Sequence, residues 1–256
     1  MNEDEHIPTQ KAKKLYQACM NTQAIEEDGL KTMKEVVQAI GGWPLVEDDN
    51  WDETNFDWIQ ATFALRDLGY PFNIFLTVLP NADKLRVRVP FSGSIEELYD
   101  VFSRRDHQVK NIAQAFGANI SNISGELNDL HQFSDKMRKQ IEHGGLISYP
   151  SHKISEIQNN IGMINWDDFI HKLIGSTLSI SSEKYITIVE EANIKKRLQT
   201  LSETPKRCRR NCSTNCLSVK SLDQFFNKDV ELLGIQSNYF AAKLAYEAYR
   251  LWIQTN

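Results

Sequence analysis

A Gly-Gly-Trp-Pro sequence at residues 41–44 constrains the fold of this chain more than any other feature. Apolar residues before it recur with the period of a helix and share one face: Met33, Val36, Val37 and Ile40. Glycine accepts the left-handed conformation that closes a helix, and proline cannot continue one. We therefore predict a positive φ at Gly41 or Gly42. We also predict that Trp43 is buried, because the chain turns back over the helix it has just left.

The rest of the chain predicts a mainly α-helical fold with a small β-hairpin between about Phe72 and Val89. Two strand-like runs flank a Pro-Asn-Ala-Asp turn, and the second alternates apolar and charged residues as a half-exposed strand does. A further short strand is predicted at residues 185–189. Helical periodicity covers residues 9–40 with a break near Gly29, and then residues 51–68, 94–116, 123–141, 166–174, 194–201 and 240–252.

Composition places the chain among soluble globular proteins and excludes two classes of function. Of its 256 residues, 41% are hydrophobic and 25% are charged. The net charge is −5 with no long run of one sign, so the chain lacks the concentrated basic face that nucleic acid requires. No apolar run approaches the roughly 20 residues that cross a bilayer. The acidic residues 1–10 are unlike a signal peptide. We therefore expect no nucleic-acid partner, and no membrane segment or signal peptide in this chain.

Three of the four cysteines, Cys208, Cys212 and Cys216, fall in one short segment, and the fourth is Cys19. Their spacing would place the three on one face of a helix. A structural zinc site takes four ligands, and no fourth Cys or His lies nearby. A disulfide to Cys19 and free thiols are therefore both preferred to a metal site. The neighbouring basic residues are predicted to lie in a solvated loop: Lys206, Arg207, Arg209 and Arg210.

The chain carries no motif for hydrolytic or cofactor chemistry. None of its six histidines belongs to an HExxH sequence, and no nucleophile elbow, phosphate-binding loop or dinucleotide fingerprint occurs. We therefore predict no catalytic residue, no metal ligand and no cofactor in this chain. The tryptophans are attributed to core packing in preference to an aromatic binding surface: Trp43, Trp51, Trp58 and Trp166.

Three N-x-S sequons occur, at Asn119, Asn122 and Asn211. This triplet is the acceptor sequence for N-glycosylation in secreted proteins. Since it also arises by chance, it favours secretion only weakly, and we treat the three asparagines as candidate glycosylation sites.

The segment LYQACMNTQAIEEDGLKTMKEVVQAIGGWPL, residues 15–45, resembles a signature of the neprilysin family of zinc metalloendopeptidases. The resemblance continues in family order to about residue 207, through WDETNFDWIQATFALRDLGYPFNIFLTV, LHQFSDKMRKQI, YPSHKISEIQNNIGMINWDDFIHKLI and YITIVEEANIKKRLQTLSETPKR. The family positions that it marks as structural are Cys19, Gly41, Gly42, Trp43, Pro44, Trp58 and Trp166. It implies a helical lobe that caps a zinc lobe, helps to enclose small peptides, and lies outside the cell or at its surface.

Departures from the family pattern divide the chain into three predicted parts. Residues 1–207 form a neprilysin-like N-terminal helical lobe. Residues 208–221 form a junction, rich in Cys and basic residues, that resembles nothing in the family. Residues 222–256 resemble a remnant of the family's C-terminal region, in which Gly234 and Asn238 stand in place of the third zinc ligand, a Glu, and its neighbouring Asp.

The resemblance therefore implies a metalloendopeptidase-family protein that lacks the family's zinc ligands. We expect this chain to be non-catalytic on its own, as a truncated or degenerate paralogue, an incomplete gene product or part of a peptidase whose zinc lobe lies elsewhere. The alternative is a peptide-binding or decoy pseudo-peptidase. In the family, the cysteine at the position of Cys19 pairs with a distant one. Here we expect Cys19 to be helical and unpaired, because the junction joins segments that are far apart in the family.

Overall fold

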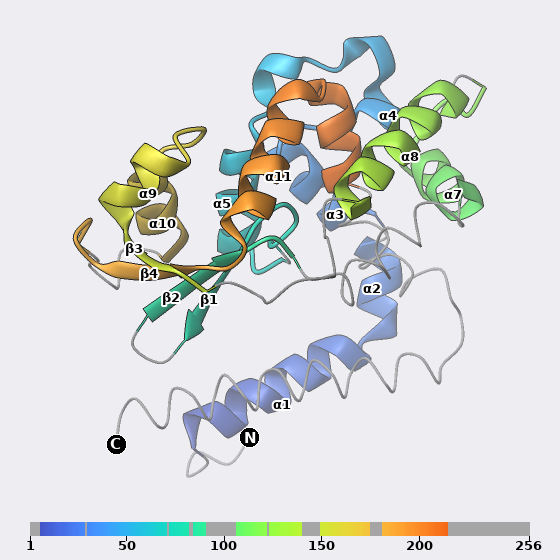
Figure 1. The fold of residues 1–256 in the computed structure, drawn as a ribbon. Coiled ribbons are helices and arrows are strands. Elements are labelled where there is room, and N and C mark those ends of the chain that lie inside the picture. The colour runs from blue at the N-terminus through green and yellow to red at the C-terminus, as the bar shows by residue number, and fades with distance from the viewer. Residues whose placement is uncertain are drawn as a thin grey trace. The chain divides into compact units, whose positions relative to one another are not determined.

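The computed structural model describes residues 6–28, 30–70, 72–81, 84–90, 106–121, 123–139, 149–174 and 181–214. The chain divides into an N-terminal segment that runs through Met33 and a compact body within residues 34–219. Helices predominate, and the described strands form one small sheet (Figure 1). The predicted mainly α-helical fold is therefore confirmed.

The N-terminal part is more divided than the sequence pattern predicts. The pattern predicts that a helical stretch over residues 9–40 divides into two helices near Gly29. A second break falls at Asn21, whose Oδ1 accepts the N–H of Ala24 and caps the next helix. The described helices are α1 (Ile7–Met20), α2 (Thr22–Asp28), α3 (Lys31–Ala39), α4 (Pro44–Glu47), α5 (Trp58–Asp67), α7 (Asp106–Phe116), α8 (Ile123–Lys139), α9 (Ile154–Asn160), α10 (Trp166–Ile174) and α11 (Glu191–Glu203), with 3-10 turns at Asp48–Asn50 and Glu53–Asn55.

Side-chain caps fix where the helices of the body begin. The Asp57 carboxylate accepts the N–H groups of Ile59 and Gln60, so α5 starts at Trp58 and not at residue 51 as predicted. Asn165 caps α10 in the same way, because its Oδ1 accepts the N–H of Asp168 at 3.0 Å. Such caps satisfy the N–H groups that a helix leaves without partners in its first turn.

The predicted hairpin is confirmed, but it is part of a larger sheet. Strands β1 (Thr77–Asn81) and β2 (Lys84–Arg88) pair antiparallel. The predicted strand at residues 185–189 is β4 (Tyr185–Ile188), which pairs parallel with β2. A fourth strand, β3 (Ser151–Lys153), was not predicted, and it pairs antiparallel with β4 to give the order β1-β2-β4-β3. At three residues, β3 is too short to show the alternation by which a strand is recognised in sequence.

An aromatic cluster at the centre of the body joins the sheet side to the helices. Phe169 on α10 contacts the rings of Trp58, Phe63 and Trp166 at centroid distances of 5.8–6.3 Å. Trp58 also meets Phe75 edge to face at 5.7 Å. Figure 1 shows α9 and α10 beside one end of the sheet, and α10 packs on both α9 and α5. The four tryptophans assigned to core packing are all buried, as predicted: Trp43, Trp51, Trp58 and Trp166.

Several predictions fall outside the residues that the structure describes. These are the helices at residues 94–105 and 240–252, the remnant at residues 222–256 with Gly234 and Asn238, and the side chains of Cys19, Asn122 and Cys216. Within the described ranges, no helix combines the length and the apolar character needed to cross a bilayer.

Candidate functional site

The Gly-Gly-Trp-Pro signature closes α3 with a Schellman motif. Gly41 donates to the carbonyl of Gln38 and Gly42 donates to the carbonyl of Val37, both at 3.0 Å. This pair of bonds needs a left-handed residue after the helix. The φ angles of Gly41 and Gly42 are +100° and +74°, which confirms the predicted positive φ.

Trp43 is 1% exposed, as the turn geometry predicted. Its ring meets Phe116 of α7 edge to face at 5.3 Å, so the turn is fixed to a second helix. The backbone N–H of Trp43 donates to the carboxylate of Glu47 at 2.8 Å, which closes the short helix α4. Trp51 adds an indole N–H donated to the carbonyl of Gly41 at 2.8 Å. The signature residues are therefore occupied in building this turn.

Residues 206–214 form a helix, called here the clamp helix. It packs on the turn at residues 41–44, called the signature turn. Arg210 lies at its centre and is fully buried. The Arg210 guanidinium donates to the carbonyls of Val37 and Gly42 and stacks over the ring of Phe56, 5.5 Å from the ring centroid. A cation at this point also complements the negative end of the α3 dipole. Burial lowers the pKa of Arg210 to about 9, so the group is still charged at neutral pH.

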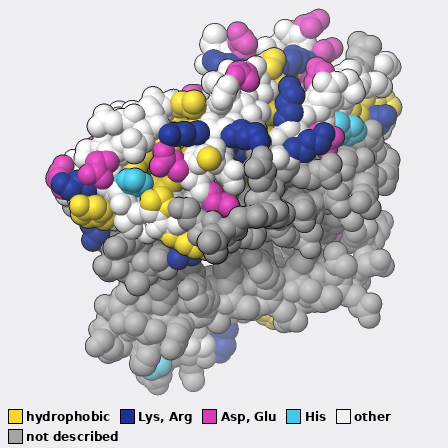
Figure 2. Space-filling model, in the orientation of Figure 1, with side chains coloured by type: hydrophobic (Ala, Val, Ile, Leu, Met, Phe, Trp, Pro, Cys, Tyr) yellow, Lys and Arg dark blue, Asp and Glu magenta, His cyan; other side chains and the backbone are white. Residues whose placement is uncertain are grey.

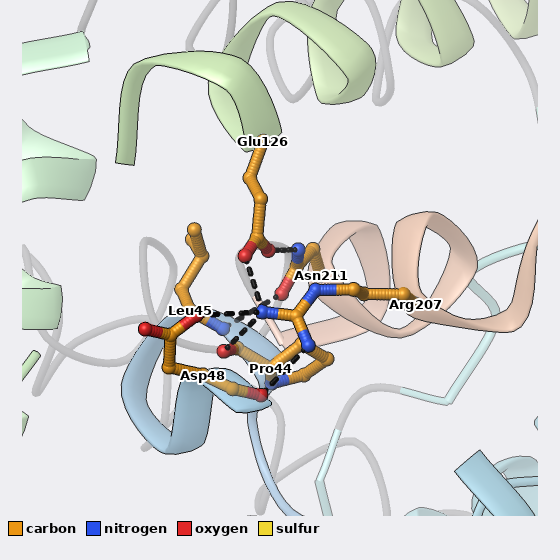
Figure 3. A network of polar contacts seen from close by, with 6 residues as sticks. All are labelled: Pro44, Leu45, Asp48, Glu126, Arg207 and Asn211. Carbon is orange, nitrogen blue, oxygen red and sulfur yellow. Dashed lines mark hydrogen bonds and ion pairs between the residues drawn. The ribbon is translucent and has the colours of Figure 1, made fainter. Parts of the chain in front are cut away.

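Two further residues of the clamp helix bind the ends of α4 (Figure 3). Asn211 Oδ1 accepts the N–H of Leu45 in the first turn of α4, at 3.2 Å. Arg207 donates to the carbonyl of Pro44, the first residue of α4, at 3.2 Å and to the carbonyl of Asp48, which follows its last residue, at 2.8 Å. Glu126 of α8 joins the two, because its carboxylate pairs with Arg207 and accepts the amide N–H of Asn211.

The clamp helix corrects one expectation from the sequence and bears on two others. The basic residues 206–210 do not lie in a solvated loop, since Arg210 is buried and Arg207 is partly buried in the network. The predicted boundary at residue 207 falls inside this helix, and residues 208–214 lie in the same compact body as the residues before them. The division of the chain into three parts stays a prediction. Asn211 is 2% exposed, and its glycosylation stays a prediction.

A signal for the clamp helix was present in the sequence. Arg207, Arg210 and Asn211 have the spacing of residues that share one helix face, as do Cys208 and Cys212. The charge of the segment nevertheless favoured a solvated loop, because arginine is mostly exposed and is rarely buried without partners. Here the partners are backbone carbonyls that lie more than 160 residues earlier in the chain.

The described residues do not fit a catalytic zinc ion. His152 Nε2 lies 3.7 Å from the Glu191 carboxylate, and His152 Nδ1 lies 4.0 Å from that of Glu156. Glu191 already pairs with Lys195 at 2.8 Å, and Glu156 accepts the N–H of Lys153 at 3.0 Å. Catalytic zinc takes three protein ligands at about 2.0–2.2 Å. Within the described ranges, no cluster of three or more His, Cys, Asp or Glu residues could hold a metal ion.

The cysteines are placed in two different helices. Cys19 lies in α1, which confirms that it is helical, whereas its pairing stays a prediction. Cys208 and Cys212 lie on the clamp helix, where Cys212 is buried and the thiol of Cys208 donates to the carbonyl of Asp129. Burial raises the pKa of Cys208 from 9.0 to about 12, with a smaller contribution from Asp129. A thiol in this state is a poor metal ligand and a poor nucleophile.

Charged side chains of both signs lie on the face shown in Figure 2. On this face, Lys and Arg side chains are interspersed with Asp and Glu side chains. Oppositely charged residues one helical turn apart also pair on the described helices, as Lys172 does with Asp168 at 3.0 Å.

Comparison with known proteins agrees with this architecture. The model of peptidase family M13 matches residues 1–214, which include the clamp helix. Neprilysin-2 of Drosophila melanogaster is 23% identical over 226 residues, covering 75% of this chain and 27% of the relative. Neprilysin-21 of Caenorhabditis elegans is 23% identical over 220 residues, covering 77% of this chain and 28% of the relative. Mouse neprilysin is 41% identical over 51 residues, which is 20% of this chain and 7% of the relative.

This chain therefore spans less than a third of the length of the relatives that it matches over most of its own length. The family match nevertheless covers the signature turn, the sheet and the clamp helix without interruption. On the strength of that match, the chain belongs to peptidase family M13.

Proposed function

We propose that this chain is a neprilysin-like helical lobe, located outside the cell or at its surface, that holds no catalytic zinc and hydrolyses no peptide by itself. The observation that carries the proposal is the use of the family signature. Gly41, Gly42 and Trp43 build a turn, and Arg207, Arg210 and Asn211 of the clamp helix bind its backbone. These residues therefore have a structural role, and their contacts are made within the fold.

The sequence supports the same proposal through its histidines. A catalytic zinc of this class needs a helix with two histidines four residues apart and a further acidic ligand. The six histidines of the chain, at positions 6, 107, 131, 143, 152 and 171, contain no such pair. The role that the helical lobe has in the family, enclosing small peptides beside a zinc lobe, is the role proposed for this chain.

Elemental analysis and a peptide assay test the proposal together. The purified protein is expected to contain no stoichiometric zinc and to leave a small quenched peptide uncleaved. Zinc bound in a one-to-one ratio, together with hydrolysis that a chelator abolishes, would show that the proposal is wrong.

A second candidate function, a peptide-binding or decoy pseudo-peptidase, is favoured by an open groove beside α9. The groove has a volume of about 490 Å³ and is lined by amide side chains, among them Gln158, Asn159 and Asn165, and by the half-exposed Met163. Amides could pair with a peptide backbone. Fluorescence anisotropy of a labelled small peptide would detect this binding. Met163→Asp should then weaken it, whereas Leu68→Asp, at an exposed position that does not line the groove, should not.

A further inference from the structure

We propose that Asn119 is an N-glycosylation site of this protein and that folding closes Asn211, which carries the same acceptor sequence, to that modification. The proposal rests on the extracellular placement proposed above. The substrate class is an oligosaccharide carried on a lipid pyrophosphate. The two asparagines differ in the surroundings of one atom, the side-chain amide nitrogen Nδ2.

The chemistry requires that nitrogen to be accessible. Nδ2 forms a bond to the anomeric carbon of the sugar while the bond from that carbon to the pyrophosphate oxygen breaks. The lipid pyrophosphate leaves with the electron pair, and Nδ2 gives up one proton to a base of the transferase, so nothing is oxidised or reduced. The product is bulky and belongs at a surface.

Asn119 meets these requirements. It is exposed and lies between α7 and α8, just after Gly117 ends α7 with a φ of +107°. Its Oδ1 accepts the N–H of Ser121 at 3.1 Å, so the bond involves the oxygen of the amide and not the nitrogen. Ile120, the middle residue of the sequon, is 44% exposed. All three residues of the acceptor sequence therefore lie at the surface.

The side-chain nitrogen of Asn211 is not accessible once the clamp helix has packed against the body. Both atoms of its amide are engaged, Nδ2 with Glu126 of α8 and Oδ1 with the N–H of Leu45. Ser213, the third residue of the sequon, is also 2% exposed, and its hydroxyl donates to the carbonyl of Arg209 at 3.0 Å. A sugar on Nδ2 would break the bond to Glu126 and occupy the space in which the clamp helix packs. Glycosylation at Asn211 and docking of the clamp helix therefore exclude each other.

Secretion from eukaryotic cells behind a cleavable leader, followed by peptide mass spectrometry after enzymatic deglycosylation, tests the proposal. Ser121→Ala should abolish occupancy at Asn119, and Ser124→Ala, which removes the sequon at Asn122, should leave it unchanged. Ser213→Ala is the matched control at the buried sequon, and it should change neither the number of glycans nor their position on the folded protein.

Two results would overturn the proposal. One is an unmodified Asn119 in the secreted protein. The other is a glycan on Asn211 in protein whose melting temperature equals that of the unmodified form. Because the leader is supplied, neither result depends on where the protein is naturally located. Zinc content and peptide hydrolysis are measured separately, so failure of the proposed function would be recognised independently.

Discussion

Gly41 is constrained both by its positive φ and by close packing, whereas Gly117 is constrained by its positive φ alone. Gly41 and Gly117 both end a helix with the same pair of backbone hydrogen bonds, at φ angles of +100° and +107°. A Cβ on Gly41 would lie 2.8 Å from the carbonyl oxygen of Asn55, whereas one on Gly117 would meet nothing within 4 Å. The conformational cost is therefore shared, and the steric cost belongs to Gly41 alone.

We predict that Gly41→Ala destabilises the protein clearly more than Gly117→Ala does. The left-handed φ should cost each variant about 1–2 kcal/mol, and the contact with Asn55 should add to this in Gly41→Ala only. Urea denaturation of both variants measures the difference in the free energy of unfolding. Equal losses would mean that the backbone at residues 41–55 relaxes and that the turn is less rigid than its packing indicates.

The partly buried thiol of Cys208 leads to a prediction about pH. Its pKa is raised from 9.0 to about 12 in the folded chain, mainly by burial. Between these values the unfolded chain loses the proton and the folded chain keeps it. The stability linked to this group is therefore complete below the unfolded pKa and is lost as the pH rises toward the folded one.

We accordingly expect Cys208 to resist alkylation in the folded protein across this range and to react at once in denaturant, since the thiolate is the reactive form. Peptide mapping by mass spectrometry distinguishes it from the other three cysteines. Cys208→Ala should show a shallower loss of melting temperature with rising pH. Rapid labelling of Cys208 in native protein near its ordinary pKa would contradict the assigned burial.

At the scale of elements, the sequence predicted what local pattern determines and missed what distant contacts determine. The end of α3, the burial of Trp43 and the hairpin follow from glycine conformation, chain reversal and period-two alternation, which neighbouring residues set. The packing of the clamp helix does not follow from neighbouring residues, because burial of Arg210 depends on the carbonyls of Val37 and Gly42, which lie far away in the chain. For the same reason, the parallel pairing of β2 with β4 could not be predicted from either strand alone.

The clamp helix provides an internal comparison between adjacent arginines. Arg210 is fully buried and binds two carbonyls, whereas Arg209 is partly exposed. Arg210→Met should cost about 1–3 kcal/mol, because it leaves buried acceptors unsatisfied. Arg209→Met should change stability by less than about 0.5 kcal/mol, as surface substitutions usually do. Thermal denaturation of both variants checks this, with Arg210→Lys expected to fall between them because an ammonium cannot reproduce the guanidinium fork. If Arg210→Met left the stability unchanged, the desolvation cost of the buried charge would cancel the contribution of its hydrogen bonds.

At the scale of the whole molecule, the body should unfold as one cooperative unit. Its sheet joins residues as far apart in sequence as Leu85 and Ile186, and its clamp helix binds α3 and α4. The ring of Phe169 on α10 contacts aromatic side chains of both α5 and α10, and it is 1% exposed. A cavity at this position should therefore be felt well beyond α10.

We predict that Phe169→Ala lowers the free energy of unfolding by about 3–5 kcal/mol, the usual cost of truncating a buried phenylalanine. Hydrogen exchange followed by mass spectrometry should show equal loss of protection in β4 and in α3, because exchange in a cooperative unit proceeds through one global opening. Tyr185→Ala, at a 48% exposed position on β4, serves as the control and should leave both segments protected. If Phe169→Ala increased exchange in β4 and α10 but spared α3, the body would consist of two units that open separately. The clamp helix would then stabilise the signature turn independently of the sheet.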